Sequence, residues 1–282
     1  MYQNILLCTD GSPGSEVAAD YAIWFAHRLG ARLRALYVTD IRILEGPLVA
    51  DISGALGAQP YSGLVPLLQR IQQEKASTTL SAVAARCQAK NVPLETVHET
   101  GPLVGVMLDH ERHADLVVLG QRGEHAQWHG EMLGSSVERM LRATIKPSLM
   151  AAGEFRPIQH MLIAYDGSGE SQKALRAGID LAPALAVQQV TIVTVCQKEH
   201  EAAATAILQQ GRQLALDRHV NAETQLVHGH PEAEILRLTE KLPADLLVMG
   251  AYGHTRIREF ILGSTTSHVI RKARVPVLLG RS

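Results

Sequence analysis

The sequence predicts an α/β protein made of two tandem domains, each built on a doubly wound parallel sheet. Three observations predict this class. The chain has 282 residues, which is enough for two domains with a buried core each. The order of its motifs occurs twice. In each half, short apolar runs alternate with segments of helical periodicity, which is typical of parallel strands joined by crossover helices.

The internal repeat begins at the first strand of each half. "NILLCTDGSPGSEVAADYA" at 4–22 aligns with "HMLIAYDGSGESQKALRAG" at 160–178, and both show the pattern strand, turn, helix. Further along, "ADLVVLGQRGEHAQWHGEMLGSSVERML" at 114–141 aligns with "ADLLVMGAYGHTRIREFILGSTTSHVI" at 244–270. A duplication of one domain explains why the pieces keep the same order.

These alignments predict one domain at 1–152 and another at 157–282, joined by a segment so short that the halves are expected to pack tightly. The expected strands are nearly uninterrupted apolar runs, as a sheet covered on both faces requires. Their central residues are Leu6, Leu36, Val117, Ile163, Val193 and Leu247. A last short strand in each half begins near Pro147 or Pro276, and the missing N–H of proline favours a sheet edge there.

One segment breaks the symmetry of the two halves. About 27 additional residues fall within 41–70 of the first half, whereas the second half passes almost directly from its second strand into a helix. The segment is apolar and carries three prolines, which is not typical of a solvated linker. We interpret it as an insertion packed over its own core, with a lid over the first-half site or a partner surface as the alternatives.

Charge and cysteine content exclude several classes of protein. A net charge of -1 and a pI near 6.9 give no general attraction to nucleic acid or anionic membranes. Cys8, Cys87 and Cys196 are widely spaced, so we expect reduced core thiols and neither disulfides nor a zinc site. No signal peptide and no run of about 18 apolar residues is recognisable. We therefore expect a cytoplasmic protein that partners neither nucleic acid nor membrane.

The carboxyl ends of the strands are the expected binding edge of each sheet, because ligands of doubly wound folds bind where the strand order reverses. Asp10 and Asp166 follow the first strands, and Val38 and Val195 lie at the ends of the second strands. The fourth strands lead into glycine-containing loops that run into helices. Each half therefore brings the same three elements to one edge.

The second-half loop spells Gly250, two residues, Gly253, nine residues, and then Gly263, Ser264 and Thr265 at the start of a helix. Positive φ at the strand-end glycine would let the chain turn and let a ligand approach the main chain. Ser264 and Thr265 are expected as cap residues, and the free N–H groups of the first turn would face an anion. A lone Gly-x-x-Gly favours a plain turn, but the long spacing and the repetition favour an anion site.

On these residues the chain resembles the universal stress protein family, specifically its members with two domains in one chain. The family signature is Gly, two residues, Gly, nine residues, Gly and then Ser or Thr, and 250–265 fits it without departure. The Asp-Gly-Ser turn after the first strand and the Ala-Asp before the fourth also match. The resemblance implies a Rossmann-like fold in which 275–279 runs beside 145–150, so that the halves form an internal pseudo-dimer. A further homodimer stays open.

The resemblance also implies a pocket for an adenine nucleotide, ATP or AMP. Its second-half residues would be Asp166 and Val195 at the adenine, Gly250 at the ribose, and Gly253, Gly263, Ser264 and Thr265 at the phosphates. The first-half counterparts are Asp10, Val38, Gly120, Gly123, Gly134, Ser135 and Ser136. The resemblance extends to a divalent ion, Mg²⁺ or Mn²⁺, when the ligand is ATP, although no set of metal ligands is identifiable in the sequence.

The first half departs from the signature. Ten residues, not nine, separate Gly123 from Gly134, and they include Trp128 and Gly130. One additional residue would shift the amides that meet phosphate. Nucleotide binding is therefore expected in the second half first, and stays open in the first half.

Three functions stay open. The leading hypothesis is a stress-response protein that senses or stores an adenine nucleotide and has at most slow ATP hydrolysis, because neither a P-loop nor a base paired with a nucleophile is identifiable. A second is an adenylating enzyme of a related fold, whose Ser-Gly-Gly loop neither "DGSPGS" nor "DGSGES" reproduces. A third is a nucleotide-free interaction protein that docks a partner through 41–70.

Two polar groups are interpreted as surface features. His228 and His230 are close in sequence, but no third ligand stands at a spacing that supports a metal site. "RKAR" at 271–274 is expected at a solvated helix end, where cations complement the helix dipole, and not in a nucleic-acid patch.

Overall fold

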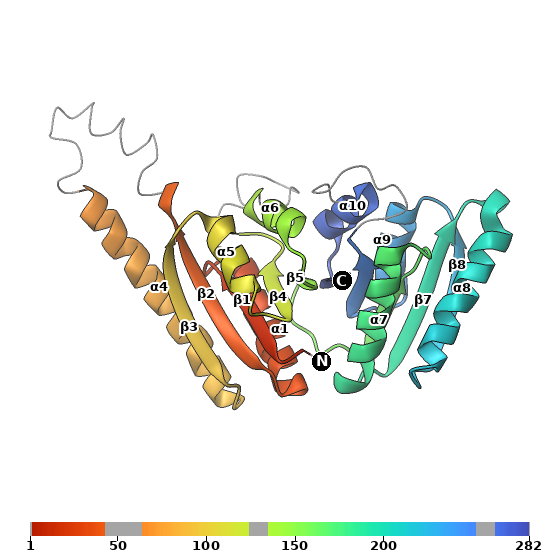
Figure 1. The fold of residues 1–282 in the computed structure, drawn as a ribbon, viewed down its shortest axis with the longest axis horizontal. Helices are drawn as coiled ribbons and strands as arrows, with labels where there is room; N and C mark the ends of the chain where they lie inside the picture. Colours follow the sequence, from red (N-terminus) through yellow and green to blue (C-terminus); the bar gives the residue numbers. More distant parts are fainter. Residues whose placement is uncertain (1, 43–63, 124–134, 252–262, 282) are drawn as a thin grey trace, which may run out of the picture.

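The structure is a computed structural model that describes residues 2–42, 64–123, 135–251 and 263–281. Its strands form one ten-stranded sheet in the order β3-β2-β1-β4-β5-β10-β9-β6-β7-β8. Figure 1 shows the two halves on either side of β5 and β10, with α4 at one end of the molecule and α8 at the other. The predicted α/β class is confirmed, and the two predicted sheets are joined into one.

The first half contributes β1 (Asn4–Thr9), β2 (Arg32–Asp40), β3 (Leu94–Gly101), β4 (Leu116–Gly120) and β5 (Ser148–Ala151). Its described helices are α1 (Pro13–Leu29), α4 (Leu64–Ala89), α5 (Leu103–Glu111) and α6 (Ser135–Ala143). The second half contributes β6 (His160–Ala164), β7 (Gln189–Cys196), β8 (Ala222–His228), β9 (Leu246–Gly250) and β10 (Val277–Gly280). Its described helices are α7 (Gly169–Ala184), η2 (Lys198–His200), α8 (Glu201–Leu216), α9 (Pro231–Lys241) and α10 (Ser264–Lys272).

The pairing of β5 with β10 joins the two halves. This pair is antiparallel, with Val277 opposite Met150 and Leu279 opposite Ser148, whereas the other paired strands are parallel. The internal pseudo-dimer that the family resemblance implies is therefore present. The expectation that proline marks a sheet edge is wrong, because β5 and β10 are the central strands. Pro147 and Pro276 precede them, and their carbonyls accept bonds from the fourth strands.

Local sequence explains why α1 and α7 begin where they do. Ser12 Oγ accepts a bond from Ser15 N (3.3 Å), and Ser168 Oγ accepts one from Ser171 N (3.2 Å). Pro13 occupies the first turn of α1, where its missing N–H costs nothing. At the other end of α1, Gly30 takes φ +61° and closes the helix in the left-handed conformation.

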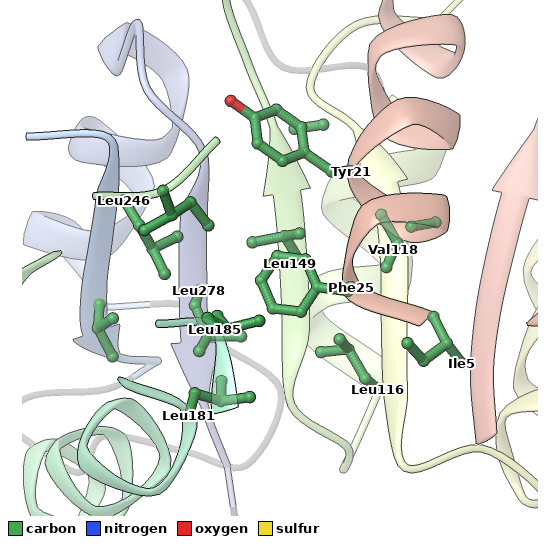
Figure 2. Close-up of a cluster of buried hydrophobic side chains, with 14 of the residues drawn as sticks. Ile5, Tyr21, Phe25, Leu116, Val118, Leu149, Leu181, Leu185, Leu246 and Leu278 are labelled. Carbon is green, nitrogen blue, oxygen red and sulfur yellow. The ribbon is translucent and has the colours of Figure 1, made fainter. Parts of the chain in front are cut away.

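The buried side chains form one core layer on each face of the sheet. The layer under α1 and α7 includes Leu149 of β5 and Leu278 of β10, so it continues across the junction (Figure 2). The opposite layer likewise contains residues of both halves, such as Met150 and Val277. The two halves therefore share their cores as well as their sheet.

Two equivalent aspartates fasten the amino ends of the strands. Asp115 Oδ2 accepts bonds from Gln3 N and Asn4 N, both at 2.9 Å. Asp245 Oδ2 accepts bonds from Gln159 N and His160 N at the same distance. The Ala-Asp that precedes the fourth strand of each half is thus structural, because its carboxylate holds the first strand at the edge opposite to the candidate site.

The junction between the halves packs on α1. The ring of Phe155 meets the ring of Tyr21 edge to face, with centroids 5.0 Å apart. Tyr21 Oη also donates to Glu154 O and accepts from Arg156 N, each at 3.3 Å. A linker held in this way does not act as a free tether.

The predicted insertion at 41–70 is described only in part. Residues 64–70 form the first turns of α4, which has 26 residues against 16 in α8, its counterpart in the second half. Residues 43–63 lie outside the described residues, so the interpretation of this part as a lid or a packed insertion stays a prediction.

Gln121 and Arg281 connect each half to the last helix of the other. Gln121 Nε2 donates to Ile270 O (2.6 Å) and Ala273 O (3.1 Å) at the end of α10. The Arg281 guanidinium donates to Leu141 O and Thr144 O at the end of α6. Because these carbonyls lie past the last intrahelical bonds, both donors satisfy buried acceptors that would otherwise lack a partner.

No helix among the described residues has the length and apolar character that crossing a membrane requires. All three cysteines are free. Cys8 and Cys87 are buried, as expected of core thiols, whereas Cys196 at the end of β7 is only half-buried. Burial raises the pKa of Cys8 to about 12, with a smaller contribution from Glu111, so this thiol stays protonated and unreactive at neutral pH.

Candidate functional site

The strand order reverses at the same place in both halves. β1 lies between β2 and β4, and β6 lies between β7 and β9. In the second half Ala164 pairs with Val193, and this register places Asp166 beside Val195 just past the carboxyl end of β6. In the first half Thr9 pairs with Tyr37, which places Asp10 beside Val38. The structure thus brings together the aspartate and valine predicted for each site.

The aspartates shape the turns that follow β1 and β6. Asp10 Oδ1 accepts a bond from Ser12 N (2.9 Å), and Asp166 Oδ1 accepts one from Ser168 N (3.0 Å). The glycine between each pair has positive φ, +75° at Gly11 and +79° at Gly167. These turns hold the aspartate backbones at the sheet edge, and glycine is needed there because other residues rarely adopt this conformation.

Gly120 and Gly250 pack against helices at the strand ends and do not turn the chain there. The expectation of positive φ at these strand-end glycines is wrong, since both remain in the extended strand. A Cβ at Gly250 would lie 2.9 Å from the backbone of Glu170 and Ser171, and one at Gly120 would lie 2.6 Å from Gly14 C. Both positions require glycine because the first turn of a helix packs directly on the strand end.

The amino end of α10 lies beside the end of β9. Thr266 Oγ1 donates to Gly250 O (3.0 Å), and Gly263 N donates to Ala251 O (3.3 Å). The role of Thr266 was not predicted, although it is the third residue of the "STT" that opens the helix. These two bonds fix the helix start against the strand.

The prediction that Ser264 and Thr265 cap α10 is wrong. Gly263 is the cap residue, and no side chain of the described residues bonds the first-turn amides. Ser264 is exposed and Thr265 half-buried, so their N–H groups lie at an open helix end. By contrast, the first turns of α1 and α7 are closed by Ser12 and Ser168. Among the described residues no side chain closes the amino end of α10, so its first-turn N–H groups and the positive end of the helix dipole together suit an anion.

In the first half, Gly123 lies close to Asp10. A Cβ at Gly123 would come within 2.9 Å of Asp10 Oδ2, so the glycine loop and the turn after β1 meet at one edge. Ser135 starts α6 as predicted, and Ser136 is half-buried in its first turn. Gly134 and, in the second half, Gly253 lie outside the described residues, so their place at the phosphates stays a prediction.

The end of β2 carries polar pairs that the sequence analysis did not single out. The Arg42 guanidinium bonds Asp40 and holds the pKa of that buried carboxyl below its usual value. Beside it, the Thr39 hydroxyl lies 2.9 Å from His98 Nε2, and burial lowers the pKa of this histidine. Asp40 and Arg42 are two residues apart, and this spacing of opposite charges at a strand end was the available signal.

The described residues contain no group of three His, Cys, Asp or Glu that could hold a metal ion. His228 instead pairs with Glu201, with Nε2 and Oε2 3.1 Å apart. What the edge offers is an aspartate turn, strand-end backbone and an open helix end, which are features of a binding site.

Comparison with known proteins identifies the family. The model of the universal stress protein family matches the chain twice, at residues 1–151 and 157–281. The chain belongs to the universal stress protein family. This universal stress protein is 36% identical over 289 residues to the universal stress protein Slr1230 of Synechocystis, an alignment that covers 99% of this chain and all of that one.

Solved structures agree on the fold. A universal stress protein from Archaeoglobus fulgidus superposes with a TM-score of 0.76 and 22% identity, and covers 99% of this chain and 98% of its own. A universal stress protein from Pseudomonas aeruginosa gives a TM-score of 0.67 at 17% identity over 99% of this chain and 93% of its own. At these identities the likeness shows the fold alone. Both alignments include the two halves of this chain.

Proposed function

We propose that this universal stress protein binds an adenine nucleotide, ATP or AMP, at the carboxyl edge of its second half. The observation that carries this proposal is the open amino end of α10, which is fixed beside the end of β9 at the point where the strand order reverses. Phosphate is favoured there by first-turn amides that no described side chain bonds, and by the helix dipole. Gly263 adds no side chain in front of them.

The other end of the ligand would meet Asp166 and Val195. Val193 O accepts a bond from Tyr165 N (2.9 Å), so by strand alternation the backbone groups of Val195 also face the β6 side, where Asp166 lies. Backbone donors and acceptors held in this way match the polar edge of a purine. Between this point and the start of α10 lies the place where the strand order reverses, between β6 and β9. Mononucleotides bind at such places in doubly wound folds.

We propose sensing or storage of the nucleotide, with no strong catalytic activity. Among the described residues at the carboxyl edge of the second half, no hydroxyl or thiol bonds a histidine, and the Thr39–His98 pair lies in the first half. Cys8 is protonated in the core. Slow ATP hydrolysis is the enzymatic alternative, and the assay for it is phosphate release by the nucleotide-loaded protein. We include no metal ion, because the described residues offer no cluster of ligands for one.

Calorimetric titration with ATP, AMP and cAMP tests the proposal, using Gly263→Val and its sequence counterpart Gly134→Val. The valine at 263 fits the observed backbone (φ -55°, ψ 145°) but covers the first-turn amides, so we expect at least a tenfold loss of second-half affinity. Gly134→Val should leave that binding event unchanged. Unaltered nucleotide binding by Gly263→Val, with native circular dichroism, would show that the loop is only a turn.

A second candidate function is partner docking near the insertion. Leu67 and Ile71 lie four residues apart on α4 and are 54% and 41% exposed, which places two large apolar side chains on one solvent-facing stripe. The candidate predicts that a partner no longer binds the Leu67→Ser/Ile71→Ser variant. Partner binding that persists in this variant, or that requires nucleotide, would contradict it.

A further inference from the structure

A cleft of about 720 Å³ lies between the two halves, on the side of α1. The first half forms one wall with the start of α1, the residues after β4 and the end of β5. The second half forms the other wall with α9 and the end of α10. This volume is within the range of small-molecule sites, which often lie between domains.

The rim of the cleft is cationic. Arg122 stands on the first-half wall, and Arg271, Lys272 and Arg274 stand on the second-half wall. All four are exposed, and Glu240 is the carboxylate of the described lining. Its Oε1 lies 4.0 Å from Arg274 Nη1, a solvent-exposed pair that contributes little. No carboxylate in the described ranges lies within 4.0 Å of the other three cations. Arg271 Nε donates to Ser267 O (2.9 Å) in its own helix.

The backbone beneath these cations is held in place. Ser12 Oγ donates to Arg122 O (3.4 Å), and a Cβ at Gly14 would lie 2.2 Å from the same oxygen. On the other wall, Gln121 Nε2 bonds the last carbonyls of α10, so a protein donor meets the negative pole of that helix. An anion bound near Arg271 and Lys272 would therefore not lie beside unpaired carbonyl oxygens.

The other side of the pseudo-dimer shows that the fold does not require this charge. Aligned from the start of the last helix, Lys272 corresponds to Ala143, and Arg274 corresponds to Ile145. Arg142, the counterpart of Arg271, is paired with Glu138 at 2.5 Å. Two of the four cations, Lys272 and Arg274, thus have uncharged counterparts, although the same β5–β10 pairing joins the halves at both places.

The two places also differ in space. Arg281 follows β10 and spans the interface to reach Leu141 and Thr144. Its counterpart after β5 is Ala152, one of the small residues that line the cleft. Gln121, the residue after the neighbouring strand β4, bonds the end of α10 instead. A short side chain stands at the cleft where a long one fills the equivalent position.

We propose that this cleft binds a small organic polyphosphate, a molecule with two or more phosphate groups that the four cations hold from both walls. The carbon body of such a ligand would lie against Val17, Leu236 and the alanines of the cleft. This site is separate from the second-half nucleotide site, because Gly263 and Lys272 stand at opposite ends of α10, about 13 Å apart. It does not depend on nucleotide binding there. It adjoins the first-half candidate site, because Gly123 lines the cleft.

Calorimetry with inorganic tripolyphosphate as the probe tests the site at low ionic strength. The variant Lys272→Ala/Arg274→Ile installs the counterpart residues and should weaken binding at least tenfold, because two of four cations are lost. Arg142→Gln, which removes a cation from the equivalent place, is the matched control and should bind as the parent does. Higher salt should weaken the parent more than the double variant.

The second-half nucleotide site is distinguished by Gly263→Val. We expect this variant to keep tripolyphosphate binding in the cleft, and we expect Lys272→Ala/Arg274→Ile to keep ATP binding. Equal tripolyphosphate affinity in the parent and the double variant overturns the cleft site. Equal losses of tripolyphosphate affinity in the double variant and in Arg142→Gln would overturn it as well, since the probe would then respond to overall charge. A loss of affinity in Gly263→Val alone would also overturn it, since the probe would then bind at the loop at 250–265.

Discussion

The two ends of the junction solve the same problem with different residues. At one end Gln121 donates to Ile270 O and Ala273 O, and at the other Arg281 donates to the equivalent carbonyls, Leu141 O and Thr144 O. Gln121 follows the fourth strand of the first half, whereas Arg281 follows the last strand of the second. The interface thus requires that these buried acceptors be satisfied, and does not require one donor at one position.

The choice of donor decides what else each end can do. The long side chain of Arg281 occupies its end of the junction, where Ile145 and Ala143 add no charge. At the other end the amide of Gln121 reaches the carbonyls from the neighbouring strand, and the cleft with Arg271 and Lys272 stays open. Divergence of the two copies has therefore produced a different donor at each end, and the cleft described above lies at the Gln121 end.

Arg281→Ala should give the largest loss of stability. It removes a buried cation and leaves two buried carbonyls without its bonds, so we expect about 3 kcal/mol less free energy of unfolding in urea. Arg142→Ala, an exposed arginine in an i,i+4 pair, is the control and should cost about 0.5 kcal/mol or less. Similar losses in both variants would contradict the sealing role of Arg281.

Gln121→Ala should have a smaller effect of the same kind. A neutral amide donor contributes less than a charged one, and the open cleft admits water to the exposed carbonyls, so we expect a loss of about 1 kcal/mol. Urea denaturation of the two single variants compares the ends directly. If Gln121→Ala lost as much free energy of unfolding as Arg281→Ala, the charge of the donor and the cleft beside it would make no difference between the two ends.

The smallest effect concerns the ends of the second strands. Because Arg42 holds the pKa of Asp40 below its ordinary value, the pair stabilises the fold above the unfolded pKa, and this contribution is lost as pH falls through the lower folded pKa. The second half has Gln197 at the equivalent place, which donates to Gly229 O and does not titrate. Asp40→Asn should therefore reduce the acid dependence of stability measured below about pH 4, whereas Gln197→Ala should not.

Most of the fold could be predicted from the sequence because its central strands are buried on both faces. The six predicted strand centres lie in β1, β2, β4, β6, β7 and β9. A third strand was counted in each half but not located, and in the first half this strand is β3. It is an outer strand with several exposed residues that interrupt the apolar run. The prolines before β5 and β10 suggested an edge because proline lacks a donor, but both stand just outside the paired residues.

For the candidate site, the sequence predicted where residues lie more accurately than what each of them does. Register places Asp166 beside Val195, as the motif implies. Gly250, however, is needed for contact with α7, and Gly263 takes the cap position expected of Ser264. Such roles depend on packing between segments far apart in the sequence, which motif spacing does not encode. The bonds of Gln121 and Arg281 were missed for the same reason.

The core layers that continue across β5 and β10 set a limit on how this chain can be divided. If the chain were cut within 153–159 and the halves were separated, each half would expose a strand edge with a row of unpaired N–H and C=O groups beside apolar side chains such as Leu149 or Leu278. An exposed edge of this kind is a template for pairing with a strand of another chain. Covalent tandem linkage keeps the correct edge within reach at every concentration, which protects a freshly made chain from aggregation.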